Sequence, residues 1–415
     1  MMTSKELYEG ILGLKSPWMV DAVNLKTAEK EVRVVVRYRE GSRFVCPECG
    51  KRMPLYDHRD RRWRHLDTCQ MKTILEGRFP RVECAEHGVL DVEVPWAEKG
   101  SRWTLMFEAL AIMLLKDSDV TAAATALRIS WEGAWAIAER AVARGLEQRR
   151  QAPLKQVLVD EKAFRKGHDD LTLVANTSGE GGAKVEHITE GRDTESLASF
   201  WKAQRPERLA EVEAIAMDLH RPYWEATVAH VPGAIAKIVH DRFHLMRHVQ
   251  EGLNTVRKQE HRQLQEEGFD LLKATKYLWL KNPSDWTPEQ KHDFQAIKTA
   301  NLMTSKAWAM KETIRHLWSY RSVGVARKFF KRWARWVRRS KLRPMMKVAD
   351  MFERHLDNIL TFCRHRLTTA ALEAINAKIV LVKKRSRGIA NVEHLKTLIY
   401  FHCGGLDLNP SPIHS

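Results

Sequence analysis

Apolar and polar positions change their spacing several times along the chain, and each change predicts a different kind of structure. Up to residue 98, short apolar runs such as residues 32–36 predict strands. Residues 103–150 are rich in alanine, repeat apolar positions at helical spacing and predict three helices. Residues 246–365 are long, charged and helix-like, and residues 366–403 return to an amphipathic helix. The pattern therefore predicts a β-rich start followed by mostly helical segments.

The stretch between residues 154 and 245 is the exception, because strand-like and helix-like runs alternate there. The strand-like runs are 156–160, 171–175, 184–188, 214–218 and 236–240, with helical stretches at 194–204 and 221–230. Three strands, a helix, a strand, a helix and a strand is the order of an RNase-H-like core, an inference that rests on fold analogy. We therefore predict a multidomain α+β protein whose α/β core is interrupted by an all-helical insertion.

Composition narrows the class of partner. The 415 residues contain 69 Lys and Arg against 52 Asp and Glu, a net charge of +17. Such an excess suits nucleic acid, although a generally basic soluble protein would show it too. The longest apolar run, Ala109 to Leu115, is far shorter than the roughly 20 residues of a membrane span. Because the N-terminus also lacks an apolar secretory core, we expect a cytoplasmic protein.

Two closely spaced pairs of metal-binding residues lie in the β-rich segment. They are Cys46 with Cys49, and Cys84 with His87. In a reducing compartment such pairs predict a tetrahedral structural Zn²⁺ site in a zinc ribbon. His65 and Cys69 are rival ligands outside the paired spacing, and four unrelated buried residues are the alternative. We expect basic residues between the pairs to help grip DNA, namely Arg61, Arg62 and Arg64.

The helical segment that follows has the order of a helix-turn-helix. Residues 121–127 and 131–139 are helix-like, and Ser130 between them is a suitable N-cap for the second helix. That helix would enter the major groove, with Trp131 and Trp135 on or near its leading face. A plain helical hairpin with core tryptophans is the alternative.

Carboxylates stand where α/β sheets place their chemistry. Asp160 and Asp218 each end an apolar strand run, so both would project from the carboxyl edge of the sheet. Paired carboxylates suit Mg²⁺, and two such ions can activate an attacking oxygen and stabilise a leaving one. Further along, Glu373, Asn376 and approximately Lys383 share one helical face. The alternative for each aspartate is a helix N-cap or a turn residue. The alternative for the Glu373 helix is an ordinary solvated face.

A strongly basic segment runs from Arg321 to Arg343, with ten Lys or Arg and no acid. Its aromatic residues recur at helical spacing, which predicts a helix that turns aromatics inward and cations towards DNA phosphates. A solvated helix is the alternative, and the sequence does not choose which Trp could stack on a base. The predicted phosphate-binding residues are Arg327, Lys328, Lys331, Arg332, Arg335, Arg338 and Arg339.

The order of motifs resembles the DDE transposases of bacterial insertion sequences, specifically the ISL-type group with an N-terminal zinc ribbon. The motifs span nearly the whole chain: Cys46-Pro-Glu-Cys49-Gly, Asp160-Glu161 with 165–168, Ala216-Met-Asp218, Asp241-Arg-Phe-His244, Glu373-Ala-Ile-Asn376-Ala-Lys378, and 384–388. The resemblance implies a DNA-binding zinc ribbon at 1–98, a helix-turn-helix at 99–150, core residues 151–248, a helical insertion at 249–365 and the core's last helix and tail at 366–415.

The resemblance also implies roles for single residues. Asp160, Asp218 and Glu373 would be the catalytic acids and hold Mg²⁺ or Mn²⁺. Asp241 and His244 look like a D-x-x-H pair that supports the site, although Asp241 stays open as the second metal ligand. The remaining assignments are Asn376 and Lys378 as supporting residues, and Lys383, Lys384 and Arg385 as DNA-binding residues.

Two positions depart from the family pattern. Residues 368–370 replace the usual turn before Glu373, which affects the loop but not the acid. His87 stands where a second cysteine is common, which puts the fourth zinc ligand in question.

The expected activity is cleavage at the ends of an insertion sequence and transfer of the freed 3′-hydroxyl into target DNA. The implied partners are double-stranded DNA, as terminal inverted repeats and target, and a second copy of the chain, because two ends must be held together. A non-catalytic DNA-binding regulator, such as a domesticated transposase, and an RNase-H-like nuclease without strand transfer are the alternatives.

Overall fold

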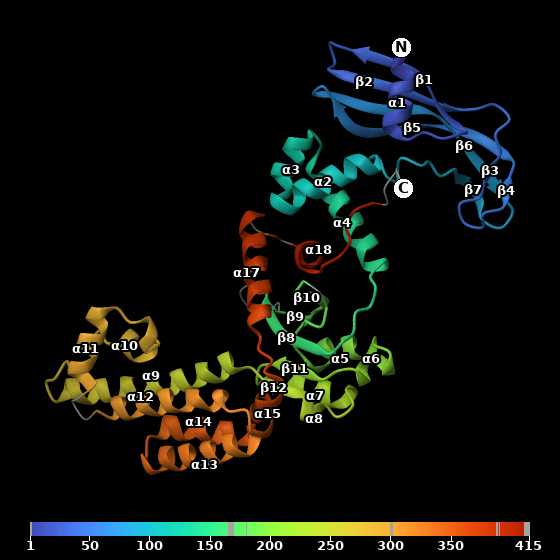
Figure 1. Cartoon of the computed structure of the whole chain (residues 1–415). Coiled ribbons are helices and arrows are strands. Elements are labelled where there is room, and N and C mark those ends of the chain that lie inside the picture. Colours follow the sequence, from blue (N-terminus) through green and yellow to red (C-terminus); the bar gives the residue numbers. More distant parts are fainter. Residues whose placement is uncertain are drawn as a thin grey trace. The chain divides into compact units, whose positions relative to one another are not determined.

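The protein is described by a computed structural model, which places residues 2–164, 170–179, 181–298, 302–386, 389 and 391–410. The motif at 165–168 and residues 387 and 388 lie outside the described residues. The chain divides into two compact units, Met1–Arg149 with Val382–Ser415, and Arg150–Leu381 (Figure 1). No helix within the described ranges is both long and apolar enough to cross a membrane.

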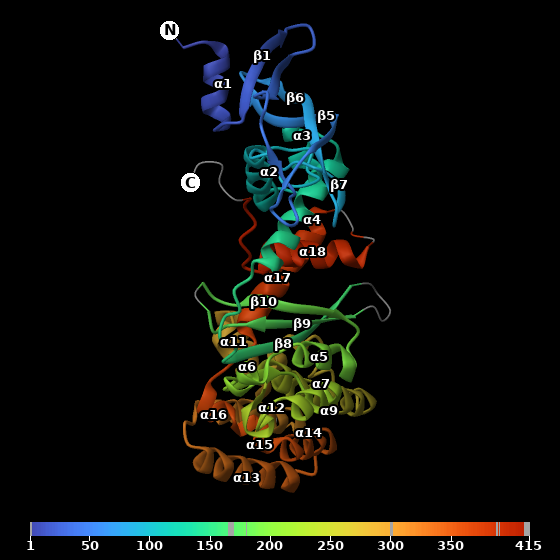
Figure 2. The same cartoon turned by 90° about the vertical axis from the view of Figure 1, so that its right-hand side faces the viewer.

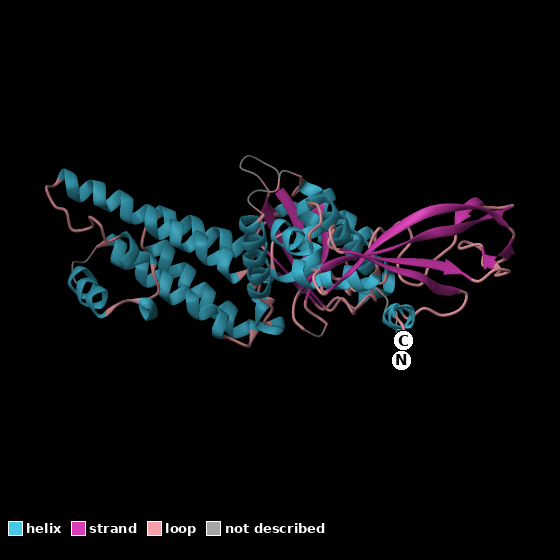
Figure 3. Ribbon diagram, turned by 90° about the horizontal axis from the view of Figure 1, so that it is seen from above, coloured by secondary structure: helices cyan, strands magenta, loops and turns pink. Residues whose placement is uncertain are grey.

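The first unit begins with helix α1 (Ser4–Leu12) and a five-stranded sheet, whose strands are magenta in Figure 3. The sheet order is β1-β2-β6-β5, and β7 pairs with β6 outside this order. Buried and less buried residues alternate along β2, as expected for a strand with one face in the core. The strands are β1 (Trp18–Lys26), β2 (Glu31–Tyr38), β5 (Leu55–Thr68), β6 (Met71–Cys84) and β7 (Gly88–Asp91), and β3 (Phe44–Val45) pairs with β4 (Arg52–Met53).

Three helices follow the sheet and pack with the last helix of the chain. They are α2 (Leu105–Asp117), α3 (Val120–Leu127) and α4 (Trp131–Glu147), and the last is α18 (Val392–Cys403). Ser130 caps α4 as predicted, because its Oγ accepts a hydrogen bond from the Gly133 N–H at 3.1 Å. Residues 366–415 were predicted to belong with the catalytic core, but Leu398 and Phe401 of α18 are buried in the core of the three helices in the first unit.

The second unit contains a five-stranded sheet in the order β10-β9-β8-β11-β12. Strands β8, β9 and β10 are antiparallel, and β11 runs parallel to both β8 and β12. Figure 2 shows β10, β9 and β8 side by side, with α5 and α7 beyond β8. The elements are β8 (Gln156–Ala163), β9 (Asp170–Asn176), β10 (Lys184–Glu190), α5 (Thr194–Lys202), α6 (Pro206–Ala210), β11 (Ala214–Met217), α7 (Arg221–His230), α8 (Ala234–Lys237) and β12 (Ile238–His240). This order confirms the predicted α/β core.

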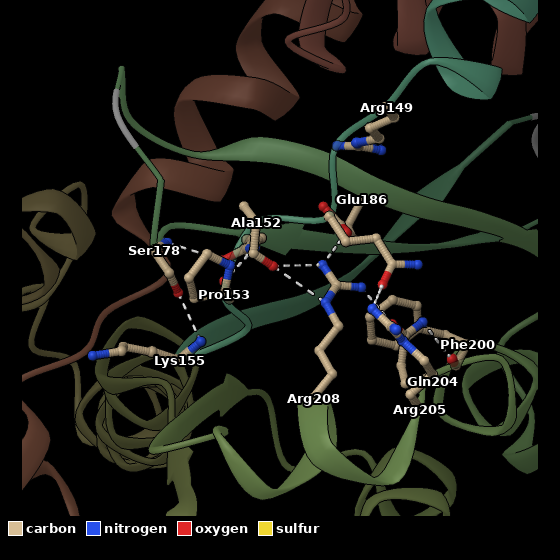
Figure 4. Close-up of polar contacts among 12 residues, drawn as sticks. Arg149, Ala152, Pro153, Lys155, Ser178, Glu186, Phe200, Gln204, Arg205 and Arg208 are labelled. Atoms are coloured by element: carbon tan, nitrogen blue, oxygen red, sulfur yellow. Dashed lines mark hydrogen bonds and ion pairs between the residues drawn. The ribbon is translucent and has the colours of Figure 1, made fainter.

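Arg208 in α6 fixes the segment that leads into β8 (Figure 4). Its Nε and Nη2 donate to the Ala152 carbonyl at 3.2 and 3.0 Å, and Nη2 lies 2.5 Å from a carboxylate oxygen of Glu186. Beside it, the Ser178 hydroxyl oxygen accepts a hydrogen bond from the Lys155 N–H at 2.9 Å. These interactions hold the start of the central strand of the sheet.

A helical insertion separates β12 from the last helix of the unit. Its long helices α9, α12, α13 and α14 pack side by side (Figure 1). Asn358 ties the end of the insertion back to the core, since its Nδ2 donates to the Ile235 carbonyl at 2.7 Å. The elements are α9 (Arg242–Glu266), α10 (Lys276–Leu280), η1 (Pro283–Asp285), α11 (Pro288–Lys298), α12 (Met303–Ile314), η2 (Arg315–Ser319), α13 (Val323–Arg339), α14 (Arg343–Arg354), α15 (Leu356–Leu360), α16 (Phe362–His365) and α17 (Ala370–Arg385).

Glu260 stabilises the start of α12 from its place in α9. Its carboxylate accepts hydrogen bonds from the Met303 and Thr304 N–H groups, both at 2.7 Å, and from the Thr304 hydroxyl at 2.5 Å. The side chain is 6% exposed, so these groups have little access to water. The carboxylate therefore satisfies helix N-terminal donors that would otherwise be unpaired.

Replacing Glu260 by Ala should destabilise the helical insertion by about 2–3 kcal/mol, because buried donors lose their acceptor. Amide hydrogen exchange should rise throughout α12. The matched control is Glu266→Ala on the same helix, where the side chain is exposed. Equal exchange in the two variants would contradict this role for Glu260.

Candidate active site and DNA-binding surfaces

Asp160 lies on β8 and contacts α17. Val157 and Val159 of β8 pack in the cluster formed with α5 and α7, so by alternation Asp160 points to the opposite face of the sheet. There Asn376 of α17 donates from Nδ2 to Asp160 Oδ2 at 2.8 Å. The other oxygen, Oδ1, accepts a hydrogen bond from the Glu161 N–H at 2.9 Å.

Asp218 lies level with Asp160 because of the register between two parallel strands. Ala216 of β11 is paired with Leu158 of β8, and each aspartate follows two residues later. Asp218 accepts a hydrogen bond from the His220 N–H at 2.9 Å, which fixes the turn after β11. The register thus brings the two predicted acids level on neighbouring strands. Asp218 follows the last residue of β11, but Asp160 does not end its strand as predicted, because β8 continues to Ala163.

Glu373 reaches this edge through α17. It precedes Asn376 by three residues, so the two side chains lie on one face of the helix, one turn apart. The side chain of Glu373 is exposed, and its backbone N–H donates to the Thr369 carbonyl at 2.9 Å. The hydrogen bond from Asn376 to Asp160 brings α17 to the Asp160 side of β8, and Glu373 lies one turn before Asn376 on that helix.

The electrostatics of this edge favour a cation. Burial raises the pKa of Asp160, while the Glu161 N–H, Asn376 and His244 lower it and the neighbouring Asp218 raises it again. The Asp160 and Asp218 carboxylates offer oxygen donors of the kind that Mg²⁺ prefers. Among the described residues, the group whose ligand atoms all lie close together is the Cys46, Cys49, Cys84 and His87 cluster.

Asp241 and His244, the pair that was predicted to support the site, lie at the start of α9. Asp241 is 3% exposed and caps the helix, accepting a hydrogen bond from the His244 N–H at 3.4 Å. Its own N–H donates to the Met217 carbonyl at 2.8 Å, which ties it to the end of β11. Asp241 is thus committed to the backbone, whereas Asp218 acts directly on the pKa of Asp160.

Lys378 is placed differently from its predicted supporting role. It is exposed and follows Asn376 by two residues, which turns it to the other side of α17. The supporting role of Lys378 was predicted from the family motif alone. On α17 its side chain does not share the helix face from which Asn376 contacts Asp160.

Sequence reasoning missed a second polar cluster on the other face of β8. Glu161 lies 3.4 Å from Arg192, which is also 3.6 Å from Asp170. Burial raises the pKa of Glu161, Arg192 lowers it, and Asp218 raises it. The signal in the sequence was the adjacent Asp160-Glu161 pair, but nothing local indicated that Arg192 would approach it.

The four predicted zinc ligands come together where the turn between β3 and β4 meets the last residue of β6 and the turn that follows it. Their ligand atoms all lie within 4.8 Å of one another. Cys84 Sγ lies 3.4 Å from His87 Nδ1, and Cys49 Sγ lies 3.9 Å from Cys84 Sγ. Zn–S bonds of about 2.3 Å and Zn–N bonds of about 2.0 Å in a tetrahedron require separations of this size. The cluster therefore fits a Cys₃His zinc ribbon.

The two rival ligands lie elsewhere. His65 is buried, its Nδ1 lies 2.9 Å from the Thr104 hydroxyl, and burial lowers its pKa to about 4. Cys69 is exposed and outside the cluster. The paired spacing in the sequence identified the four clustered residues without either rival.

The arginines of the ribbon do not form one exposed surface. Arg64 is 7% exposed and binds Asp67 and the His65 carbonyl, and burial lowers its pKa to about 10, which corrects its predicted role in gripping DNA. Arg61 is half-buried over the Trp63 ring at 4.5 Å. Arg62 is exposed and lies 3.1 Å from Glu76.

The predicted recognition helix, α4, is partly covered by α18. Trp131 is exposed, but Trp135 is 6% exposed and lies 4.3 Å from the His394 ring. Trp135 therefore has little surface left for a DNA groove, which corrects its predicted role. At the end of α17, Lys384 and Arg385 are exposed and Lys383 is half-buried.

Helix α13 has the predicted division between an aromatic and a basic face. Phe330 and Trp333 are buried, whereas Trp336 is 39% exposed. Arg327 pairs with Asp357 at 2.6 Å, and Arg338 pairs with Asp350 and Glu353, so these two are partly neutralised. The other predicted cations have no ion-pair partner in the described part of the chain, namely Lys328, Lys331, Arg332, Arg335 and Arg339.

Comparison with known proteins matches three segments to transposase families. Residues 157–399, more than half of the chain, match the transposase family model of ISL3 elements. Residues 42–87 match the zinc-finger of the IS204/IS1001/IS1096/IS1165 transposases, and residues 92–142 match the helix-turn-helix domain of transposase family ISL3.

Two curated relatives extend the likeness over most of the chain. The transposase for insertion sequence element IS1557 of Mycobacterium tuberculosis is 25% identical over 435 residues, covering 97% of this chain and 96% of that protein. The transposase for IS1001 of Bordetella parapertussis is 25% identical over 356 residues, covering 85% and 86%. The three matched segments follow one another in the order of the zinc cluster, the three helices and the acid-bearing sheet. The chain therefore belongs to the ISL3 family of insertion-sequence transposases and is a DDE transposase with a zinc ribbon and a helix-turn-helix.

Proposed function

We propose that Asp160, Asp218 and Glu373 form the centre at which this transposase cuts and joins DNA phosphodiesters. The observation that carries the proposal is the 2.8 Å hydrogen bond from Asn376 to Asp160, because it brings α17, the helix that carries Glu373, to the strand that carries Asp160. The substrates would be the terminal inverted repeats of the element and a target duplex. Because its substrate would be cellular DNA, we propose that the enzyme acts in the bacterial cytoplasm.

The three acids would hold Mg²⁺ or Mn²⁺. When bound, these ions supply Lewis acidity that favours the attacking oxygen and the leaving oxygen of a phosphodiester. In the cleavage step, water adds to phosphorus and the bond to the 3′-oxygen breaks, which leaves a free 3′-hydroxyl. In the joining step, that hydroxyl displaces a 3′-oxygen of the target strand, and its proton leaves to solvent.

The chain's other residues in this centre orient the acids. The Asn376 amide and the Glu161 N–H each bind a different oxygen of Asp160, so its carboxylate has one rotational setting. The His220 N–H does the same for Asp218. Asp241 caps α9 and donates its N–H to the Met217 carbonyl, so it holds the start of α9 against the end of β11.

We propose a second copy of the chain as partner, since two element ends must be held together before joining. We further propose Zn²⁺ in the Cys₃His cluster and DNA phosphates on the unpaired cations of α13. The α13 cations suit this task because exposed Lys and Arg without acidic neighbours release counterions from DNA when they bind.

Replacing any of the three acids by its amide should abolish metal-dependent cleavage of element ends while DNA affinity is kept. Asp241→Asn is the matched comparison, because asparagine is also a good N-cap, and it should retain much of the activity. Cleavage and strand transfer of pre-cut 3′ ends would be measured separately. Full activity of Asp218→Asn together with an inactive Asp241→Asn would move the second ligand to Asp241.

Replacing Cys84 by Ser should remove zinc from the purified chain and loosen the backbone around the end of β6. Elemental analysis of chelator-free protein gives the zinc content, and the rate of limited proteolysis near Cys84 reports the loosening. Cys69→Ser is the control and should keep the metal. Zinc retained by Cys84→Ser but lost from Cys69→Ser would refute the ligand set.

Replacing Lys331, Arg332 and Arg335 together by Gln should weaken DNA binding for all sequences. The slope of log affinity against log salt should shrink by about 0.9 for each phosphate that the variant no longer neutralises. Arg338→Gln is the control on the same helix, because acids already neutralise Arg338. An unchanged salt slope in the triple variant would remove α13 from the DNA-binding surface.

A further inference from the structure

A cavity of about 310 Å³ lies in the first unit, where α3, α4, α18 and the end of α17 meet. The side chains that matter for its chemistry are Asp119, Trp131, Trp135, Arg385 and His394. All belong to the unit that contains the helix-turn-helix segment. The catalytic centre described above uses none of them.

Two stacked indoles form one side of this cavity. The rings of Trp131 and Trp135 are 5.5 Å apart and nearly parallel, at 5°. Trp135 is almost fully buried against His394, whereas Trp131 is 39% exposed. A rigid inner indole thus supports an outer one that remains accessible, which makes a flat aromatic platform.

The inner indole carries a polar group without a partner. Trp135 Nε1 is buried and has no hydrogen-bond acceptor among the described residues. Six other tryptophans share this feature among the described residues, namely Trp63, Trp96, Trp201, Trp286, Trp308 and Trp318. Because the Trp135 nitrogen is itself buried, Trp135 contributes its ring to the cavity as the support for Trp131.

Positive charge at the rim of the cavity narrows the chemical class of ligand that it could bind. Arg385 is exposed, and its Nη1 donates to the Asp117 carbonyl at 3.4 Å, which leaves most of the guanidinium available. Lys384 beside it is exposed as well. An aliphatic ligand would use neither the cations nor the exposed aromatic face of Trp131, whereas a planar heteroaromatic ring linked to a phosphate would use both.

We propose that this cavity receives an unpaired nucleobase, stacked on Trp131 with its phosphate at Arg385. The inference rests on DNA binding by this transposase and adds to it a site for a single base. The same chemistry could come from a base within bound DNA or from a free mononucleotide. The structure therefore assigns a function to an aromatic surface that a groove-reading helix would not need.

The test uses the full chain and a short single-stranded oligonucleotide with one 5-iododeoxyuridine. Irradiation should cross-link the iodouracil to the peptide that contains Trp131, as mapped by mass spectrometry. Trp131→Ala should weaken binding of this oligonucleotide roughly 5- to 100-fold, the range for one stacked base. Trp131→Phe should restore most of the affinity, and Arg385→Gln should lower it with the cross-link kept.

Met113→Ala is the control, because Met113 is exposed on α2 outside the cavity. Competition by deoxythymidine monophosphate distinguishes the sources: displacement at low concentration supports a free nucleotide, and none supports a base within DNA. Unchanged affinity of Trp131→Ala with no cross-link at the cavity would overturn the proposal. If duplex DNA still binds in that case, only the cavity assignment falls; if the wild-type chain binds no DNA, DNA binding itself falls.

Discussion

The hydrogen bond from Asn376 to Asp160 is the interaction on which the proposed catalytic geometry depends. The parallel register of β8 and β11 brings Asp160 and Asp218 level by itself, because Ala216 is paired with Leu158, two residues before each aspartate. Glu373 has no such constraint, since it lies on a helix that begins only after the whole insertion. The amide of Asn376 connects that helix to the strand, and helical spacing then fixes where Glu373 lies.

This hydrogen bond requires that the insertion return the chain to its starting point. Asn358 binds the Ile235 carbonyl next to β12, and so holds α15 against the strand from which the insertion departs. Arg366, just before α17, donates to the Trp318 and Tyr320 carbonyls at 2.8 and 2.9 Å. A long helical excursion therefore ends at a fixed point. The position of the third acid is set by backbone acceptors as much as by its own helix.

The sequence predicted those features that depend on local pattern. The strand run before Asp218, the Ser130 cap and the paired spacing of the zinc ligands each depend on residues that lie close together in the sequence. The run up to Asp160 was also predicted as a strand, but β8 continues past Asp160 to Ala163. It could not predict how distant segments would meet. Trp135 looked available because α4 is amphipathic, but His394 arrives from a helix near the end of the chain. Arg64 follows Trp63 on β5, so strand alternation predicts that its side chain faces the surface. In the structure its guanidinium instead lies over the Phe107 ring at 5.2 Å.

Net charge shows the same limit in energetic terms. A sum of +17 counts every cation equally, although only cations without a protein partner release counterions from DNA when they bind. Arg208 and Lys311 are nearly buried and donate to backbone carbonyls. The free-energy penalty of leaving those carbonyls without a donor exceeds the stabilisation that an exposed, salt-screened contact with DNA would provide. The charge available to DNA is therefore set by which cations remain unpaired after folding, and on α13 this condition separates Arg335 from Arg338 although they are one turn apart.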